Sequence, residues 1–299
     1  MAMEPFDTFY QERKQLVIKQ RDFNPYSIEL DESKLISTDQ LLIEGKTEIG
    51  SGGYSTVFKG WYKDEVVAIK YIENDDRRKR ENQNVIKKEI DILSQMKNDN
   101  IVKFIGASVH PAACIIVMEY VDGKSLEDFI KEEVFDLTKS LRFALDISRA
   151  MEHVHEKKII HMDLKPENIL ISTDLSTLKL VDFGIAVGET AERTQTLPKA
   201  GSYLYTAPEL LRRMKYDHKV DIYSFSLIFW GMLKNELPFE DMNLHDIKTK
   251  VVEQGTRPCL EGIPSEISSL LQRCWSDEIN LRPDFTDVVK ELSEFIGSS

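Results

Sequence analysis

The stretch His161-Met162-Asp163-Leu164-Lys165-Pro166-Glu167-Asn168 decides the fold. It places a carboxylate and an amide five positions apart with a lysine between them, and apolar residues 159–160 and 169–171 lie on either side. Short apolar runs rich in β-branched residues are typical of buried strands, so the polar run between them is expected to be a loop held at both ends. Such a loop can direct a carboxylate, an ammonium and an amide toward one point.

The groups in this loop are those that phosphoryl transfer requires. Asp163 offers an acceptor for the proton of an attacking hydroxyl, Lys165 a cation beside the transferred group, and Asn168 an oxygen ligand for a metal. The alternative is a polar surface loop without a chemical role, because short motifs also occur by chance. The neighbouring motifs bear on that choice.

A second motif, Gly50-Ser51-Gly52-Gly53-Tyr54-Ser55, lies between two runs of strand composition, residues 41–43 and 57–61. Glycine permits positive φ and lets backbone N–H groups approach a phosphate closely. Such a turn alone is more typical of an ordinary hairpin. A third strand-like run, residues 66–70, follows and ends in Lys70. Rossmann and P-loop sites need a helix directly after the glycines, whereas the composition here predicts strands.

Glu89 lies within an apolar stripe at helical spacing over residues 83–96. Because an unpaired buried carboxylate is costly, it needs a cation, and Lys70 is the natural partner. The alternative is a glutamate at the edge of the stripe that faces water. Asp182 ends a strand-like run and is followed by Phe183-Gly184. Its carboxylate adds a second hard oxygen ligand suited to Mg2+.

The remaining pattern predicts further strands over residues 100–106 and 115–121, a turn and domain boundary at 122–123, and helices over 125–131, 138–156 and 222–233. Asp221 precedes the last of these helices and is expected to accept hydrogen bonds from backbone N–H groups, including those of the 161–168 loop. Arg282 is expected to pair with Glu209.

Composition excludes several classes of protein. The chain has 299 residues, is 41% hydrophobic and carries a formal charge of −12, which argues against a general binder of nucleic acid or of anionic membranes. Cys114, Cys259 and Cys274 are far apart and form no CxxC, so reduced thiols and a cytoplasmic location are expected. Residues 1–12 lack the apolar segment of a signal peptide. The longest apolar run, residues 222–233, is too short to span a bilayer, so no membrane insertion is expected.

Taken in order, these motifs closely resemble those of eukaryotic protein kinase catalytic domains, from about residue 39 to residue 296. Residues 230–239 and 274–285 resemble the tyrosine-kinase-like branch of Ser/Thr kinases. The resemblance implies an α+β bilobal fold. It comprises a small N-lobe over residues 37–121, with five antiparallel strands and one major helix, and a larger, mainly helical C-lobe over 122–299. Residues 1–36 are expected to be an extension that packs on the domain or is partly disordered.

The resemblance implies a role for each matching position. The catalytic residues would be Lys70, Glu89, Asp163, Lys165, Asn168 and Asp182, with Asn168 and Asp182 holding Mg2+. The residues expected to contact ATP are Gly50, Ser51, Gly52, Gly53, Tyr54, Ser55, Val57, Ala68, Lys70, Met118, Glu119, Val121, Ser125 and Leu170. Ser55 departs from the pattern, which usually has a third glycine there, but its hydroxyl is small.

The implied reaction is transfer of the γ-phosphoryl group of ATP to Ser or Thr hydroxyls of protein substrates. Lys165 and Ser202 stand where Ser/Thr kinases carry similar residues. The alternatives are a pseudokinase scaffold, a dual-specificity kinase and a small-molecule kinase of related fold. The physiological substrate, the pathway and the oligomeric state are not predicted.

Met162 stands where many kinases have an arginine that pairs with a phosphorylated residue of the activation loop. The candidate phosphorylation sites here are Thr190, Thr194, Thr196 and Ser202. Because methionine carries no charge, a phosphate on the three threonines would lack its main local cation. Activity is therefore expected to depend less on phosphorylation of this loop. The alternative is control by other contacts, such as those from residues 1–36.

Overall fold

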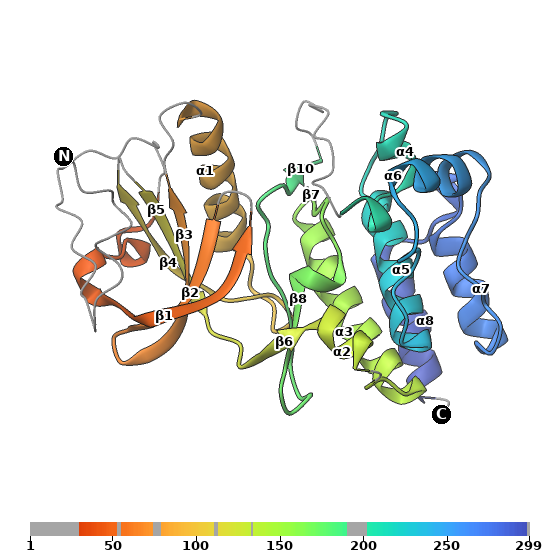
Figure 1. Ribbon diagram of the computed structural model, residues 1–299, viewed down its shortest axis with the longest axis horizontal. Coiled ribbons are helices and arrows are strands. Elements are labelled where there is room, and N and C mark those ends of the chain that lie inside the picture. The colour runs from red at the N-terminus through yellow and green to blue at the C-terminus, as the bar shows by residue number, and fades with distance from the viewer. Residues whose placement is uncertain are drawn as a thin grey trace. The chain divides into compact units, whose positions relative to one another are not determined.

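The computed structural model describes residues 30–52, 55–73, 79–110, 113–132, 134–189 and 202–297, which are coloured in Figure 1. They form two compact units. The first comprises the chain up to Lys97 together with Val102–Val121, and the second comprises Asn98–Ile101 together with the chain from Asp122 onward. Each unit has buried apolar residues of its own.

The first unit is built on a five-stranded antiparallel sheet in the order β1-β2-β3-β5-β4. Its strands are β1 (Leu41–Gly52), β2 (Ser55–Tyr62), β3 (Glu65–Glu73), β4 (Phe104–His110) and β5 (Ala113–Glu119). Helix α1 (Lys79–Gln95) lies beside the sheet and contacts β4 (Figure 1). The predicted sheet-rich part with one major helix is confirmed, although α1 begins at Lys79 rather than at residue 83.

The strand predicted over residues 100–106 is wrong in its first half. Strand β4 begins at Phe104, and the preceding segment Asn98–Ile101 belongs to the second unit. There the N–H of Leu180 donates to the carbonyl of Asn100 at 2.8 Å, and Ile101 forms a parallel bridge with Leu180. Ile101 is buried, at 2% exposure, but composition does not reveal which partner strand a segment takes.

Residues 30–36, the described part of the predicted extension, pack on the edge strand β4. The N–H of Ile36 donates to the carbonyl of Ala107 at 2.9 Å, and the Ile36 side chain joins the core of the sheet. Gly106 permits this approach, because a Cβ there would lie 2.5 Å from the carbonyl oxygen of Lys34. Residues 1–29 lie outside the described part of the chain.

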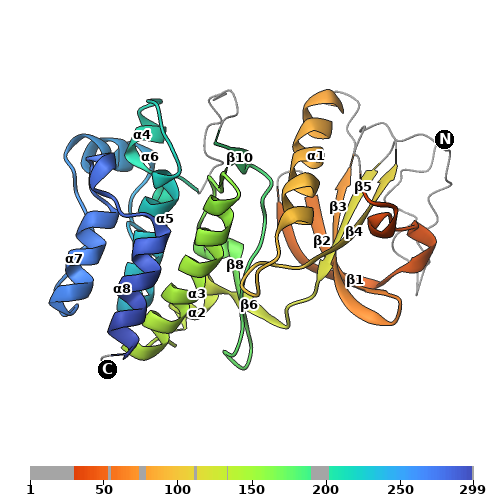
Figure 2. The same cartoon turned by 180° about the vertical axis from the view of Figure 1, so that it is seen from behind.

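The second unit is mainly helical. Its helices are α2 (Leu126–Lys131), α3 (Leu137–Glu156), α4 (Pro208–Leu211), α5 (Lys219–Lys234), α6 (Leu244–Asp246), α7 (Ser265–Cys274) and α8 (Phe285–Gly297), with a π-helix at Ile247–Glu253. Its strands are β6 (Gly123–Ser125), β7 (Ile159–Ile160), β8 (Ile169–Ser172), β9 (Leu178–Leu180) and β10 (Val187–Gly188). Helices α3, α5 and α8 lie side by side in both views, and α3 contacts each of the other two (Figures 1 and 2).

Local signals set the limits of these helices. Ser125 caps α2 in a capping box with Asp128, and Asp136 caps α3 by accepting from the N–H of Lys139 at 2.8 Å. Helix α5 is buried on all sides from Val220 to Met232, which confirms a core helix where the sequence has its longest apolar run. It ends at Asn235, whose φ of 51° is the left-handed conformation that asparagine tolerates at a helix end.

Two further expectations concern the membrane and the cysteines. Within the ranges given above, no helix combines the length and apolar character needed to cross a bilayer. Cys114, Cys259 and Cys274 are all free thiols, as predicted. Burial raises the pKa of the Cys274 thiol to about 12, and burial also raises that of Cys114.

Candidate active site

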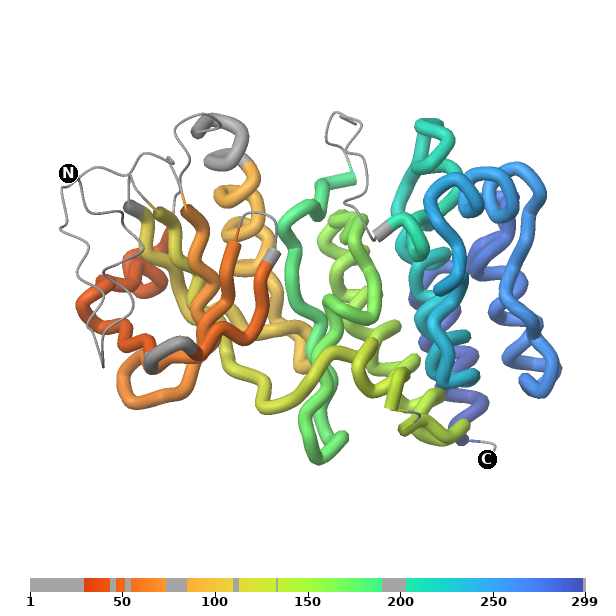
Figure 3. Tube along the Cα trace, in the orientation of Figure 1, coloured from red at the N-terminus to blue at the C-terminus, as the bar shows by residue number. Residues whose placement is uncertain are grey.

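The 161–168 loop lies between two short strands of the second unit, as the sequence predicts. Strand β7 leads into it and pairs with β10, while a 3₁₀ turn at Pro166–Asn168 leads out of it into β8. Strands β8 and β9 then form a hairpin, which Figure 3 traces in green. Both ends of the loop are therefore fixed by strand pairing.

Asp163, Lys165 and Asn168 converge within this loop. The side-chain Nδ2 of Asn168 donates to the backbone carbonyl of Asp163 at 2.8 Å and to its carboxylate Oδ2 at 3.1 Å. The ammonium of Lys165 lies 3.6 Å from the same Oδ2. Asp163 is 6% exposed and Asn168 7%. The carboxylate is thus held in one orientation beside a cation and is largely shielded from solvent.

Asp221 fixes the backbone at the start of the loop. Its Oδ2 accepts from the N–H of His161 at 2.8 Å, and its Oδ1 accepts from the N–H of Met162 at 3.0 Å. The ring Nε2 of His155 lies 2.9 Å from Oδ2. Burial alone raises the pKa of the Asp221 carboxyl, but the hydrogen bonds and charges of His155 and His161 outweigh that effect and lower it. The predicted contact between Asp221 and the loop is confirmed.

His161 is completely buried in the loop. Its Nδ1 accepts from the N–H of Asp163 at 3.3 Å, and its ring centroid lies 4.9 Å from that of Phe183. Its Nε2 has no hydrogen-bond partner within the ranges that the structure describes. Burial lowers the pKa of this imidazole, although the nearby carboxylates of Asp221, Asp163 and Asp182 oppose that shift.

Asp182 lies two residues after the end of β9. The N–H of Val181 donates to the carbonyl of Asn168 at 2.9 Å, so Asp182 is adjacent in sequence to a residue bonded to the loop. Asp182 has a φ of 59°, and its Oδ1 accepts from the N–H of Gly184 at 3.1 Å. A non-glycine residue in the left-handed region is uncommon and is held there by its surroundings.

Lys70 and Glu89 form the predicted ion pair in the first unit. The ammonium of Lys70, on β3, lies 2.5 Å from Oε1 of Glu89, on α1. Glu89 is 3% exposed, so the alternative of a solvent-facing glutamate is wrong. The pair ties the helix to the centre of the sheet, because β3 is its middle strand.

The other candidate nucleotide contacts fall into three groups. In the glycine hairpin, Gly50 pairs with Val57 and Gly52 pairs with Ser55. Ser51 lies between the two glycines on β1. Gly53 and Tyr54 lie outside the described residues. Across β3 and β5, Ala68 pairs with Met118, and Glu119 pairs with Val67; Val121 ends the first unit. In the second unit Leu170 pairs with Ser125.

A family model described as the protein kinase domain matches residues 43–292. The chain belongs to the protein kinase family. Among curated proteins, the kinase domain is 32% identical over 250 residues to the serine/threonine-protein kinase STY46 of Arabidopsis thaliana and 35% identical over 265 residues to the serine/threonine/tyrosine-protein kinase HT1 of the same plant. It is 32% identical over 254 residues to the probable serine/threonine-protein kinase drkD of Dictyostelium discoideum.

These alignments cover most of this chain but only part of the relatives. They include 83%, 86% and 83% of the present chain, and 43%, 66% and 19% of STY46, HT1 and drkD respectively. The similarity therefore concerns the kinase domain and leaves the rest of each relative unmatched.

Sequence reasoning missed a histidine pair in the kinase domain. His155 of α3 and His218, the residue before α5, have ring centroids 5.1 Å apart. Nδ1 of His218 lies 3.1 Å from Oε1 of Glu189, and its Nε2 lies 2.8 Å from Oδ1 of Asp284. The partners are 29 and 66 positions away in the chain, so no local pattern could indicate them.

Glu189 is the last described residue before the segment that contains Thr190, Thr194 and Thr196. These three candidate phosphorylation sites lie outside the described residues. The fourth, Ser202, begins the 3₁₀ turn Ser202–Tyr205.

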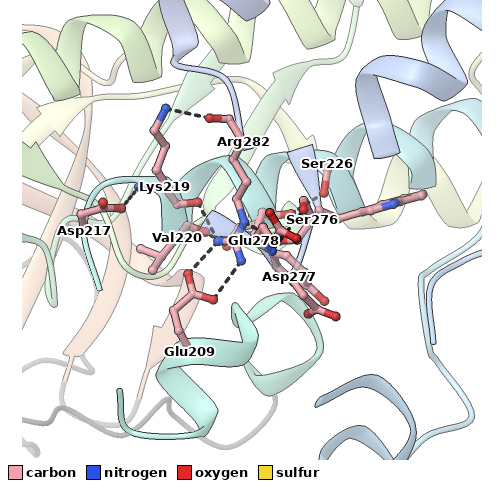
Figure 4. A network of polar contacts seen from close by, with 12 residues as sticks. Glu209, Asp217, Lys219, Val220, Ser226, Ser276, Asp277, Glu278 and Arg282 are labelled. Atoms are coloured by element: carbon pink, nitrogen blue, oxygen red, sulfur yellow. Dashed lines mark hydrogen bonds and ion pairs between the residues drawn. The ribbon is translucent and has the colours of Figure 1, made fainter. Parts of the chain in front are cut away.

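Glu209 and Arg282 form the predicted ion pair in the C-terminal half of the kinase domain (Figure 4). Two parallel hydrogen bonds of 2.6 and 2.9 Å join them, and both side chains are buried. The Nε of Arg282 also donates to the carbonyl of Ser276, and Lys219 donates to the carbonyl of Arg282. The pair joins α4 to the segment that precedes α8.

Proposed function

We propose that this kinase domain transfers the γ-phosphoryl group of ATP to serine or threonine hydroxyls of protein substrates. The observation that carries the proposal is the buried group of Asp163, Lys165 and Asn168 in a chain of the protein kinase family. The first unit would then be the kinase N-lobe, residues 37–121, and the second the C-lobe, residues 122–299, with Asn98–Ile101 as part of the latter.

Protein kinases use ATP and Mg2+, and the donor set of this chain fits that metal. Mg2+ prefers hard oxygen ligands. Asn168 donates both of its side-chain hydrogen bonds from Nδ2. The Oδ1 of this buried residue accepts no hydrogen bond from any described residue. Together with the carboxylate of Asp182, this oxygen would hold the ion. When bound, ATP supplies the phosphoryl group and Mg2+ offsets the charge of its phosphates.

The side chains of this domain would orient the reactants and accept a proton. Asp163 would accept the proton of the substrate hydroxyl at Oδ2, the oxygen that Asn168 and Lys165 hold in place. Lys165 would lie beside the transferred group, and Lys70, oriented by Glu89, would bind the α- and β-phosphates. Positioning and electrostatic stabilisation, rather than covalent chemistry, account for most of the catalysis in this class of reaction.

Substitution of Asp163 by asparagine tests the proposal. It removes the proton acceptor while keeping the size of the side chain, and we expect phosphorylation of a generic protein substrate to fall by about 10²–10⁴-fold. Asp174→Asn, on the exposed turn between β8 and β9, is the matched control. Thermal melting of all three proteins separates lost chemistry from lost folding. A wild type as inactive as the Asp163 variant would support a pseudokinase scaffold instead.

Acceptor specificity is tested separately. HT1, one of the relatives, is named a serine/threonine/tyrosine kinase, so dual specificity is the second candidate. Phosphoamino-acid analysis of the autophosphorylated protein should give mainly phosphoserine and phosphothreonine. Phosphotyrosine as the main product would reject the proposed specificity.

We also propose that the domain is active without phosphate on its activation loop, because Met162 supplies no cation there. Simultaneous replacement of Thr190, Thr194 and Thr196 by alanine should leave most of the activity. A fall of more than about tenfold would reject the proposal.

A further inference from the structure

A groove of about 590 Å³ opens on the second unit, away from the residues assigned above to catalysis. It is formed by the end of α2, the end of α5, and the two loops over residues 235–242 and 256–259. None of its lining residues is among those assigned above to catalysis or to nucleotide binding. The groove therefore has no role in the proposed chemistry.

The lining of the groove is partly apolar. Ile130 and Trp230 are buried, at 1% and 5% exposure, and the side chains of Leu237, Phe239 and Met242 are half-buried around them. A recess of this size with apolar side chains on part of its lining is suited to one or two apolar side chains of a binding partner.

The walls of the groove are fixed by hydrogen bonds. The indole Nε1 of Trp230 donates to the carbonyl of Cys259 at 2.8 Å, which holds the second loop against α5. The side chain of Asn235 accepts from the N–H of Phe135 at 3.1 Å and donates to its carbonyl at 2.9 Å, which holds the first loop. A site whose shape exists before binding loses less entropy when a partner enters it.

The rim of the groove carries more negative than positive charge. The pKa of Lys131, which also lines it, is raised by the hydrogen bond with Glu127 and in smaller part by the charge of Glu240. Glu236, Glu240 and Asp241 are exposed, and within the described part of the chain none of their carboxylates accepts a hydrogen bond or forms an ion pair. The two lining cations are already paired. Lys131 lies 2.5 Å from Glu127, and Arg257 lies 2.7 Å from Asp277, neither of which lines the groove.

We propose that this groove docks an extended segment of the protein substrate in which an apolar residue is flanked by lysine or arginine. The apolar side chain enters the recess over Trp230, and the flanking cations lie against Glu236, Glu240 and Asp241. The inference rests on the proposed function, because it concerns how that substrate is recognised. Charge complementarity also accelerates encounter and excludes acidic partners.

Binding of defined peptides to the whole chain tests the proposal without catalysis. The probes are fluorescein-labelled Gly/Ser peptides that carry Arg-Leu-Arg, Glu-Leu-Glu or Arg-Ser-Arg, measured by fluorescence anisotropy. The first should bind about tenfold more tightly than either of the others, since it alone offers both charge and an apolar side chain. Its affinity should fall as salt rises, because exposed charges are screened.

Two triple variants locate the effect. Glu236→Gln, Glu240→Gln and Asp241→Asn together should weaken binding of the Arg-Leu-Arg peptide about tenfold. The binding of the Arg-Ser-Arg peptide, which is already weak with wild type, should change less. The matched control is Asp99→Asn, Glu253→Gln and Glu278→Gln. These three carboxylates are also exposed, but they do not line the groove. The control should bind like wild type.

Phosphorylation then separates this inference from the proposed function. A serine acceptor peptide is compared with the same peptide joined to Arg-Leu-Arg. With wild type, the extension should lower KM about tenfold and leave kcat unchanged. With the groove variant, the extension should no longer lower KM, and phosphorylation of the unextended peptide should stay as in wild type. Equal binding of the three labelled peptides, or equal loss in groove and control variants, overturns the inference. If the peptides bind as expected but none is phosphorylated, the proposed function is rejected, whereas the groove still binds an apolar residue flanked by cations.

Discussion

Asp221 determines the shape of the 161–168 loop through two backbone contacts. Its carboxylate accepts from two consecutive N–H groups, those of His161 and Met162, with a different oxygen for each. An ionised carboxylate can do this because both of its oxygens are acceptors, and an amide cannot because one of its ends is a donor. The charge of Asp221, more than its size, is therefore what the loop needs.

Asp221→Asn should lower the free energy of unfolding by about 2–4 kcal/mol, because the new amide would direct a donor at a backbone N–H in a buried site. Activity should fall with it, since Asp163 lies in the same loop. Urea unfolding and initial-rate assays measure the two effects. Asp217→Asn is the control, because only one oxygen of Asp217 accepts, from the N–H of Lys219 at 2.9 Å. A loss as large in the control would show that Asp221 has no special role.

His161 makes stability depend on pH. Its folded pKa is below the ordinary value, so the unfolded chain takes up a proton first as pH falls. The stability from this group is present above the unfolded pKa of about 6.5 and is lost as pH falls below it. His161→Phe keeps an aromatic ring against Phe183 and should flatten the fall in unfolding free energy between about pH 7.5 and 5. Equal slopes in wild type and variant would contradict this.

At the scale of elements, a cluster around His218 holds Glu189 beside the start of α5 and the segment that precedes α8. His218, before α5, contacts Glu189, which follows β10, and Asp284, which precedes α8. Three elements thus meet at one side chain, which is 28% exposed. Glu189 provides a built-in negative charge directly before the segment with the three threonines.

A double-mutant cycle with Glu189→Gln and His218→Gln measures this contact. We expect each single change to lower kcat/KM and the double change to cost less than the sum, with a coupling of about 1 kcal/mol. Lys158→Gln is the control partner, because Lys158 lies 4.0 Å from Glu189 and is 75% exposed. Its coupling to Glu189 should be close to zero. Additive effects in the first cycle would mean that the contact does not act on activity.

The elements that were predictable from sequence are those whose evidence is local. Strands β2 and β3 and helices α1 and α3 follow from apolar spacing, and Lys70 with Glu89 follows from a carboxylate placed in an apolar stripe. The pairing of Asn98–Ile101 with β9 could not be predicted from the sequence. It depends on residues about 80 positions away, as in the hydrogen bond from Asn100 to Leu178. The cluster around His218 and the groove beside Trp230 arise in the same way, from segments that no motif joins.

At the scale of the whole molecule, the chain passes between the two units three times, after Lys97, Ile101 and Val121. The residues proposed to bind the nucleotide are divided between the units, with Lys70 in the first and Asp182 in the second. Nucleotide binding should therefore depend on side chains of both.

Thermal melting with ATP and Mg2+ measures that dependence. A ligand that binds only the folded state stabilises it by about 2.7 kcal/mol at roughly 100 times its Kd, so the melting temperature should rise by several degrees. Lys70→Met and Asp182→Asn should each reduce the shift strongly, and removal of Mg2+ with EDTA should affect wild type more than Asp182→Asn. A shift that is unchanged in both variants would reject the assigned nucleotide contacts.

The contrast between the three thiols offers a practical route to these questions. Cys114 and Cys274 are buried and hold their protons tightly, whereas Cys259 is exposed and lines the groove beside Trp230. A maleimide dye added to the unmutated, natively folded protein should therefore attach at a single position. Its emission would report directly on whatever occupies the neighbouring recess, in real time and without an engineered cysteine.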